Sequence, residues 1–351
     1  MNDTIKVLVV DDSALMRREI KNMLNRDPEI EVVACARNGK DALELVHRYD
    51  PDVVTMDINM PVMDGITALQ MIMMESPRPV IMLSSLTQEG ALTTFECIEL
   101  GAVDFVGKPS GTISKDIGTQ AAEIIAKVKT AARARPGKRL RSRTTQPRRP
   151  ATTSGRAANR VVAIGVSTGG PKTLLEVLPY LPADLDAAVV IVQHMPVSFT
   201  GPFAARLNAA SAIEVKEAAA GDTLLPGHGY LARGDKHMVF TRPRHGRGAM
   251  VRYVTHPRDV PHMPSVDVMM NSAVDAFGAD VIGVLLTGMG ADGAEAMVHI
   301  REAGGTTIAE HESTCVVYGM PAQAVARGGA DYVLPCYEIA DKITELLGSL
   351  V

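Results

Sequence analysis

Aromatic residues and paired cysteines are scarce in this chain. It contains no tryptophan, and Phe, Tyr and Trp together make up only 4% of its 351 residues. So few aromatic side chains argue weakly against surfaces that stack on nucleic-acid bases or on sugars. The four cysteines, Cys35, Cys97, Cys315 and Cys336, are scattered and form no CxxC pair. This spacing fits neither a zinc site nor a disulfide framework, so we expect reduced thiols in a cytoplasmic protein.

Long apolar runs and a large net charge are also missing. Although 46% of the residues are hydrophobic, no run reaches the about 18 apolar residues of a transmembrane helix. Residues 1–6 lack the basic stretch and apolar core of a signal peptide, so we expect neither export nor membrane insertion. The formal net charge of -4 indicates no general affinity for nucleic acid.

The first part of the chain alternates short apolar runs with amphipathic stretches. The expected strands are 6–10, 31–34, 53–56, 80–83 and 105–106, and the expected helices are 13–25, 39–47, 65–75 and 88–100. This alternation predicts a doubly wound α/β domain, in which helices cover both faces of a parallel sheet. In such a domain the chemistry gathers beyond the carboxyl ends of the strands.

Polar residues follow four of these five expected strands: Asp11, Asp12, Asp57, Ser84 and Lys108. Converging carboxylates repel one another, and a divalent cation with oxygen ligands is the usual remedy. A lysine and a hydroxyl suit the oxygens of a transferred phosphoryl group, and an aspartate can form an acyl phosphate. Each residue alone could simply cap the following helix, but the five together favour a chemical site.

These positions resemble the receiver domain of two-component response regulators. The matching segments are Val9-Val10-Asp11-Asp12-Ser13, Met56 to Gly65 and Gly107-Lys108-Pro109. The resemblance implies that Asp57 accepts a phosphoryl group from a histidine kinase and that Ser84 and Lys108 contact it. It also implies a Mg²⁺ site formed by Asp11, Asp12, Asp57 and the main-chain carbonyl of Asn59.

The alternation stops between about 130 and 158. Residues 133–143 and 146–150 are basic, contain proline and are almost free of apolar side chains. Such a segment cannot bury enough surface to offset its ordering entropy, which predicts a flexible linker. We therefore divide the chain into a first domain at 1–125, a linker at 126–157 and a second domain at 158–351. The alternative, a regulator that binds DNA through this segment, lacks a compact helix-turn-helix.

A second doubly wound domain is expected from 158 onwards. Its expected strands are 161–164, 187–193, 230–232, 237–241, 281–287, 306–309 and 332–334, and its expected helices are 168–178, 265–277, 291–303 and 339–347. The region 213–262 is rich in Gly and Pro, which favours a hairpin excursion over a βαβ unit.

A serine stands on the first turn of this second domain. Gly165-x-Ser167-x-Gly169 lies between a β-branched strand and a helix, the spacing of a nucleophile elbow. An ordinary βα turn, or a loop that cradles a phosphate, remains an alternative reading of this stretch. A nucleophilic serine needs a base within reach and an acid that orients the base.

Two later strand ends supply such partners. His194 terminates the next strand, and consecutive strands of a βαβ unit are often neighbours. Asp292 lies in the glycine-rich turn after the strand 281–286, although it could instead cap the following helix. Backbone N–H groups around Met289 could form an oxyanion hole. His311 is a weaker candidate for the base, and we expect surface positions for His228, His237, His245, His256 and His262.

The order Ser, His, Asp differs from that of α/β-hydrolases and of the chymotrypsin and subtilisin classes. Together with a receiver it resembles the chemotaxis methylesterases (CheB type), on residues 164–171, 193–196 and 286–293. The resemblance implies Ser167 as nucleophile, His194 as base and Asp292 as its orienter, with the N–H groups of Met289 and Thr168 binding the oxyanion.

The family resemblance also defines an expected activity. It implies hydrolysis of glutamate γ-methyl esters on chemoreceptors and deamidation of receptor glutamines, with no cofactor in the catalytic domain. The implied fold is a flavodoxin-like receiver followed by a Rossmann-like α/β catalytic domain. The receiver is expected to cover the active site until Asp57 is phosphorylated.

Overall fold

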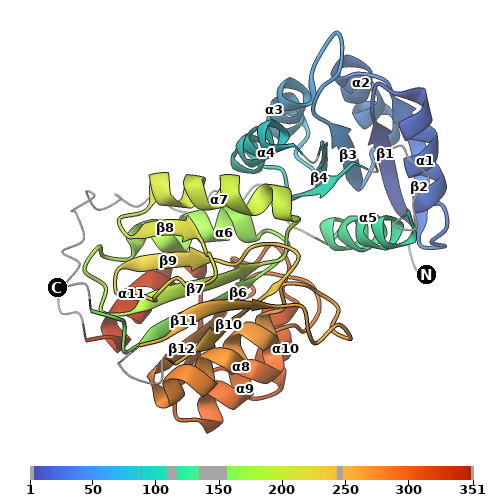
Figure 1. Cartoon of the computed structure of the whole chain (residues 1–351). Coiled ribbons are helices and arrows are strands. Elements are labelled where there is room, and N and C mark those ends of the chain that lie inside the picture. Colours follow the sequence, from blue (N-terminus) through green and yellow to red (C-terminus); the bar gives the residue numbers. More distant parts are fainter. Residues whose placement is uncertain (1–3, 86, 109–116, 134–155, 243–247, 349–351) are drawn as a thin grey trace. The chain divides into compact units, whose positions relative to one another are not determined.

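The computed structural model describes residues 4–85, 87–108, 117–133, 156–242 and 248–348. The chain forms two compact units, residues 1–139 and 140–351, each built on its own parallel sheet (Figure 1). Across the described residues no helix is both long and apolar enough to cross a membrane. All four cysteines are free.

The first unit is a five-stranded parallel sheet in the order β2-β1-β3-β4-β5. Its strands are β1 (Ile5–Val10), β2 (Ile30–Ala36), β3 (Val53–Asp57), β4 (Val80–Ser84) and β5 (Asp104–Gly107). Its helices are α1 (Ala14–Leu24), α2 (Gly39–Tyr49), α3 (Gly65–Glu75), α4 (Gln88–Leu100) and α5 (Ile117–Ala131). α1 packs on α5, and α3 packs on both α2 and α4, so helices cover both faces as predicted.

Local signals explain where these elements begin. The side chains of Ser13 and Asp64 accept hydrogen bonds from Met16 N and Thr67 N, which caps α1 and α3. β3 and β4 are buried along their whole length, as strands covered on both faces must be. α5 continues past the predicted domain limit at 125, so that limit falls inside a helix. Pro109 and linker residues 134–155 lie outside the described residues.

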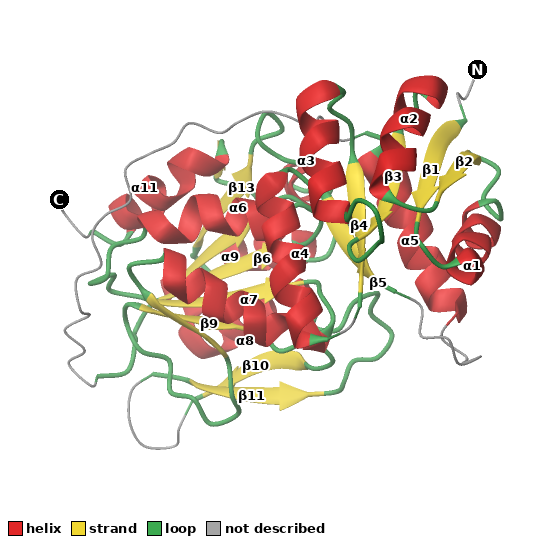
Figure 2. Ribbon diagram, turned by 90° about the horizontal axis from the view of Figure 1, so that it is seen from above, coloured by secondary structure: helices red, strands yellow, loops and turns green. Residues whose placement is uncertain are grey.

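The second unit has a seven-stranded sheet in the order β14-β13-β12-β6-β7-β9-β8, all parallel (Figure 2). Its strands are β6 (Val161–Val166), β7 (Ala188–Gln193), β8 (Glu214–Glu217), β9 (His228–Leu231), β12 (Val281–Leu285), β13 (Thr306–Glu310) and β14 (Tyr332–Leu334). Its helices are α6 (Gly170–Val177), α7 (Val197–Ala210), α8 (Val266–Phe277), α9 (Ala294–Glu302), α10 (Met320–Ala326) and α11 (Cys336–Leu346), with short 3-10 turns at Leu178–Tyr180 and Gly278–Asp280. α6 packs with α7 and α11, and α9 packs with α8 and α10, so the helices form two layers.

The region 213–262 follows the prediction only in part. β10 (His237–Thr241) and β11 (Met250–Val254) form an antiparallel hairpin, as expected. β8 and β9, however, extend the parallel sheet beyond β7, so the hairpin reading of the whole region was wrong. Both strands have four residues, too few to show a periodicity in the sequence.

The sheet order brings three strand ends together. β6 pairs with β7 on one side and with β12 on the other. The strands that follow β6 in the chain are added first on the β7 side and later on the β12 side. A topological switch point therefore lies at the carboxyl end of β6. Ser167, His194 and the turn 287–293 follow these strands directly.

Candidate active site

Ser167 follows β6 on a tight turn that ends in α6. Its carbonyl accepts from Gly170 N at 2.8 Å, and its N–H donates to Thr287 O at 3.0 Å. Gly169 has a φ of 78°, and an added Cβ would meet Val316 Cβ at 2.5 Å, so this position requires glycine. The turn therefore leaves Ser167 half-buried beside the end of β12.

His194 is held against this turn by its own backbone and by its neighbour. Its N–H donates to Val166 O at 3.2 Å. The buried Gln193 amide donates from Nε2 to Ser167 O at 3.0 Å and to His194 O at 3.1 Å. Gln193 thus ties together the residues after β6 and β7, a role that the sequence reasoning missed.

Asp292 lies 2.8 Å from His194, measured from Oδ2 to Nε2. Its oxygens also accept from Ser265 Oγ at 2.8 Å, Val266 N at 2.8 Å and Asp267 N at 3.0 Å. Burial alone would raise the pKa of Asp292, but His194 and the backbone N–H groups outweigh it and lower the pKa. The carboxylate is therefore ionised and its position is fixed.

The alternative reading of Asp292 as a cap of the helix that follows it does not hold. The N-cap of α9 is Gly293, and it makes no side-chain capping bond. Asp292 instead accepts from the first N–H groups of α8, where the helix dipole favours negative charge.

The histidine tautomer follows from this contact. An ionised carboxylate only accepts, so in the neutral imidazole of His194 the proton lies on Nε2 and the lone pair on Nδ1. Nδ1 is buried and has no hydrogen-bond partner among the described residues. Among the described residues, no hydrogen bond joins the Ser167 hydroxyl to His194. The ring of His262 stacks on that of His194 with centroids 4.1 Å apart.

The turn after β12 packs directly on Ser167. An added Cβ at Gly288 would lie 2.8 Å from Ser167 Cβ, so only glycine allows this close approach. Met289, which comes next, is 38% exposed. Thr168 is buried, and in the described part of the chain its backbone N–H makes no recorded hydrogen bond. Both predicted oxyanion donors therefore lie next to Ser167, in the turns after β6 and β12.

The histidines of the second unit differ from expectation. His237 is fully buried: it accepts at Nδ1 from Ser265 N and contacts Pro257 O through Nε2. His228 is 8% exposed and is the first residue of β9. His245 lies outside the described residues, His256 is exposed as expected, and His262 is half-buried against His194. The surface prediction was thus wrong for His228 and His237, because each begins a strand: β9 lies between β7 and β8, and β10 packs on α8.

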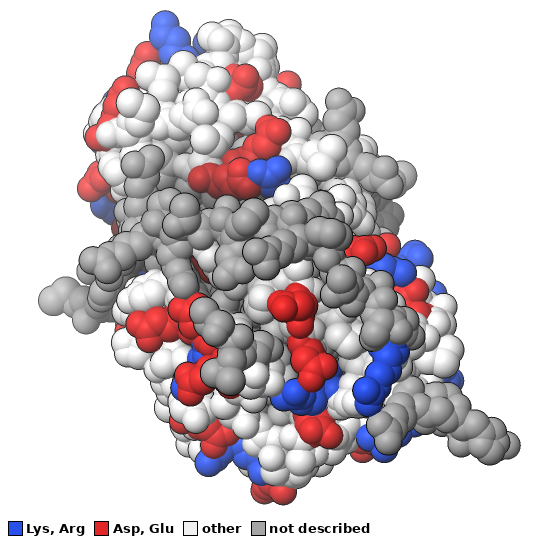
Figure 3. Space-filling view, turned by 90° about the vertical axis from the view of Figure 1, so that its left-hand side faces the viewer, with Lys and Arg blue, Asp and Glu red and all other residues white. Residues whose placement is uncertain are grey.

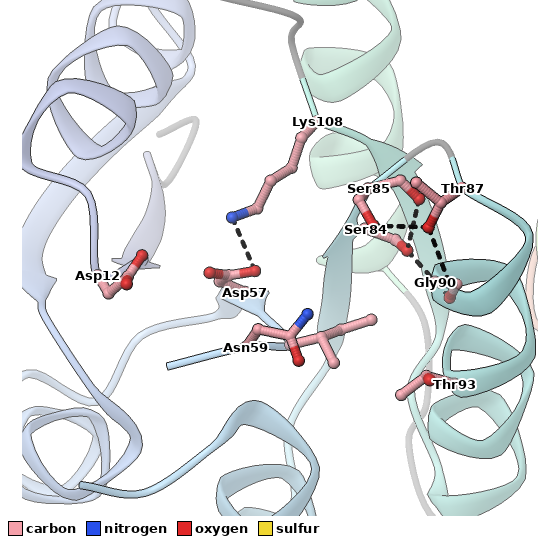
Figure 4. A pocket seen from close by; sticks show the side chains of 10 residues that line it. Asp12, Asp57, Asn59, Ser84, Ser85, Thr87, Gly90, Thr93 and Lys108 are labelled. Atoms are coloured by element: carbon pink, nitrogen blue, oxygen red, sulfur yellow. Dashed lines mark hydrogen bonds and ion pairs between the residues drawn. The ribbon is translucent and has the colours of Figure 1, made fainter. Parts of the chain in front are cut away.

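A second polar site lies at the carboxyl edge of the first sheet. Lys108 Nζ is 2.7 Å from Asp57 Oδ1 and 2.9 Å from Asp11 Oδ2. Figure 4 shows Lys108 reaching over Asp57, with Asp12 and Asn59 beside it in one pocket. Burial raises the pKa of Asp57, whereas pairing with Asp57 and Asp11 outweighs burial and raises the pKa of Lys108.

The oxygens of this pocket suit a divalent cation. Carboxylate oxygens of Asp11, Asp12 and Asp57 lie within 4.8 Å of one another. Asp11 Oδ2 is buried, and although the Lys108 ammonium is close, no hydrogen bond of acceptable geometry reaches it. A hard cation would satisfy this oxygen. Ser84 lines the same pocket, and its Oγ accepts from Thr94 Oγ1 at 2.7 Å.

Comparison with known proteins identifies both units. Residues 7–115 match the response regulator receiver domain, and residues 162–343 match the CheB methylesterase domain. The chain belongs to the CheB methylesterase family. It is 52% identical to a protein-glutamate methylesterase/protein-glutamine glutaminase 2 of Carboxydothermus hydrogenoformans, over 98% of this chain and 99% of the relative. It is 44% identical to the corresponding protein of Pyrococcus horikoshii, over 98% of this chain and 94% of the relative.

A solved structure supports the fold of the catalytic unit. The CheB methylesterase catalytic domain of Thermotoga maritima is 40% identical and superposes with a TM-score of 0.52. It covers 53% of this chain and 98% of its own. The CheB family therefore accounts for the seven-stranded unit, and the receiver match accounts for the five-stranded one.

Proposed function

We propose that this chain is a phosphorylation-regulated protein-glutamate methylesterase and protein-glutamine glutaminase, and that Ser167, His194 and Asp292 form its catalytic triad. The observation that carries the assignment of the triad is the 2.8 Å contact between His194 Nε2 and the ionised Asp292. It leaves the Nδ1 lone pair as a base next to the strand end that holds Ser167.

The reaction proceeds by acyl transfer to serine. Nδ1 of His194 takes the proton of Ser167 while Oγ attacks the γ-carbonyl carbon of a glutamyl methyl ester. The backbone N–H groups of Met289 and Thr168 stabilise the oxyanion. His194 then returns the proton to the leaving methoxide, and methanol departs. Water attacks the acyl-enzyme by the same steps in reverse and releases glutamate.

Deamidation needs only a different leaving group. A glutamine side chain presents the same γ-carbonyl carbon, and the proton from His194 converts the departing amide nitrogen to ammonia. The product of the second half-reaction is again glutamate. One triad thus serves both activities, which agrees with the double name of the relatives.

The receiver would regulate this chemistry through Asp57. We assign Asp57 as the phosphorylated residue, with a histidine kinase as phosphodonor. Asp11, Asp12, Asp57 and the Asn59 carbonyl would hold Mg²⁺, which supplies charge neutralisation for phosphoryl transfer. Lys108 contacts the phosphoryl oxygens, and Ser84 would do so after its hydroxyl turns from Thr94. The substrates would be chemoreceptors, and four free cysteines suit a cytoplasmic location.

The alternative of a DNA-binding output is not favoured. The methylesterase match accounts for residues 162–343, and the basic segment on which the alternative depends lies outside the described residues. On the face drawn in Figure 3, acidic side chains are interspersed with basic ones. The described part of that face therefore offers no continuous basic surface for a phosphate backbone.

The test is methanol release from a methylated chemoreceptor by the Ser167→Ala variant. We expect kcat to fall by about 10⁶-fold while the variant stays folded, because the nucleophile is lost. The matched control is Ser313→Ala: the hydroxyl of this exposed serine is 2.8 Å from His311 Nδ1, just after β13, so it also pairs a serine with a histidine. Full activity of Ser167→Ala, or equal loss in Ser313→Ala, would refute the assignment.

A further inference from the structure

A buried carboxyl group that the triad does not use stands behind the active site. Glu310 is the last residue of β13, next to β12, and it is 0% exposed. Its Oε2 accepts from Thr287 N at 2.8 Å and its Oε1 accepts from Thr314 Oγ1 at 2.9 Å. Burying a carboxyl group costs folding free energy unless hydrogen bonds compensate for the lost solvation. Its contacts with the active-site turn therefore require an explanation.

Thr287 connects Glu310 to the nucleophile. Its carbonyl accepts from Ser167 N at 3.0 Å, so Thr287 is hydrogen-bonded to Glu310 through its N–H and to Ser167 through its carbonyl. Its hydroxyl donates to Thr168 O at 3.0 Å and accepts from Val317 N at 2.9 Å. The N–H of Thr287 is the one remaining polar group of this residue, and Glu310 holds it.

The turn that follows Thr287 carries the proposed oxyanion donor. Gly288 packs against the Cβ of Ser167, and Met289 comes next. The Met289 N–H belongs to the peptide group after Gly288, whose carbonyl accepts from Gly319 N at 3.1 Å and Met320 N at 2.8 Å. Glu310 holds the start of the same turn, through the N–H of Thr287. Hydrogen-bond donors at an oxyanion must be held to within a fraction of an ångström, because their contribution falls steeply with misplacement.

We propose that Glu310 is a positioning residue for catalysis: by accepting from Thr287 N it fixes the turn 287–289 against Ser167. The inference rests on the proposed function, in which Ser167 is the nucleophile and the Met289 N–H binds the oxyanion. Among the described residues Glu310 makes no hydrogen bond to Ser167, His194 or Asp292, so its link to the site runs through Thr287.

The acceptor, rather than the charge, is the part of Glu310 that this role requires. A protonated carboxyl can donate from Oε1 to Thr314 Oγ1 and still accept from Thr287 at Oε2. A glutamine amide can do the same, with its NH₂ toward Thr314 and its oxygen toward Thr287. A methionine has a similar length and no comparable acceptor, so it leaves the Thr287 N–H buried and unpaired.

The experiment compares Glu310→Met, Glu310→Gln and Glu312→Gln in the full-length chain. Glu312 is an exposed glutamate two residues further on, in the turn after β13, which makes it a matched control. kcat and KM are measured by methanol release from a methylated chemoreceptor, and hydrogen exchange is followed in the segment 286–290. In Glu310→Met we expect kcat to fall about 10- to 100-fold with KM changed less than about 2-fold, and exchange to accelerate in this segment. Glu310→Gln should keep kcat within about 3-fold, and Glu312→Gln should match the wild type.

Each outcome decides the matter. A folded Glu310→Met with wild-type kcat, or a Glu310→Gln that falls as far as Met, overturns the positioning role. If Glu310→Met does not fold, Glu310→Ser takes its place, with a loss of about 10-fold expected and full activity contradicting the proposal. Ser167→Ala in the same assay keeps the two claims apart: if it stays active, the proposed function fails, whatever the Glu310 variants do.

Discussion

Half-buried Asp292 and fully buried Glu310 lie in the same domain, and burial favours the neutral form of each, yet their pKa values shift in opposite directions. Asp292 accepts two backbone N–H groups, a hydroxyl and the His194 ring N–H, and these donors stabilise its charge. The donors to Glu310 are neutral, namely Thr287 N, the Thr314 hydroxyl and the Cys315 thiol, so burial dominates and raises its pKa to about 7. The number and charge of the donors, rather than depth, decide which carboxyl stays ionised.

The raised pKa of Glu310 predicts a pH-dependent stability. Between its ordinary value of 4.5 and about 7, the folded protein holds a proton that the unfolded chain has released. The contribution of Glu310 to the free energy of unfolding therefore falls as pH rises through this window and stays constant above it. Glu310→Gln removes this titration, so its free energy of unfolding should gain about 3 kcal/mol on that of the wild type between pH 4.5 and 8. Urea unfolding at several pH values measures this; parallel curves for the two proteins would contradict it.

Single residues differed in how readily the sequence revealed them. The positions of Ser167 and His194 at neighbouring strand ends were predictable, because each directly follows a buried strand. Ser167 also lies between the glycines of Gly165-x-Ser167-x-Gly169. Gln193 and Glu310 were not, since each is the last residue of its strand and resembles an ordinary polar terminus. Their importance comes from hydrogen bonds to residues 26 and 23 positions away, which no local pattern encodes.

At the scale of elements, α8 and α9 exchange their capping carboxylates. Asp292, just before α9, accepts from the first N–H groups of α8. Asp267, in the first turn of α8, accepts in return from Ala296 N of α9 at 2.9 Å. Each helix dipole thus stabilises a carboxylate supplied by the other helix, and the pair fixes the turn that carries Asp292.

This exchange predicts that Asp267 supports catalysis indirectly. Asp267→Ala should lower the free energy of unfolding by about 1 kcal/mol, because α9 loses a capping acceptor. It should also lower kcat a few-fold, since the turn before α9 becomes looser. Asp267→Asn keeps an acceptor for Ala296 N, so it should retain most of the wild-type free energy of unfolding and most of the wild-type kcat. Thermal denaturation and methanol release measure the two effects, with the exposed Asp275→Ala on the same helix as control. A loss in Asp275→Ala equal to that in Asp267→Ala would contradict the role.

Helices without internal interruptions were predicted almost to the residue, and irregular elements were missed. α3 and α4 begin and end at the predicted residues, and the strongly amphipathic α1 and α2 lie within two residues of theirs. α7 was not predicted, because Gly201 and Pro202 interrupt a helix that tertiary packing of Phe199 and Phe203 nevertheless stabilises. The four-residue strand β8 was missed, because its place at the sheet edge comes from pairing with β9, which in turn pairs with β7.

At the scale of the whole molecule, the two units place different chemistry at the same point of similar sheets. In each, polar residues lie just beyond the carboxyl ends of neighbouring parallel strands, where helix N-termini and backbone turns stabilise charge. Carboxylates and a lysine gather in the receiver, and a serine, a histidine and an aspartate gather in the catalytic unit; in the proposed function the first set would serve a phosphoryl group and the second an acyl group. Their union in one chain makes sense if the first reaction controls the second.

The control is testable because Asp57 belongs to the receiver site alone. In the wild type Lys108 pairs with Asp57, and phosphorylation would place a larger negative charge against this ammonium. Asp57→Ala should keep basal methanol release, since the triad is intact, but lose the stimulation that a small-molecule phosphodonor with Mg²⁺ gives to the wild type. Ser167→Ala is the complementary control: it should take up the phosphoryl group yet hydrolyse nothing. Stimulation of Asp57→Ala to the wild-type level would show that the phosphodonor acts elsewhere, and the receiver would then have no gating role through this residue.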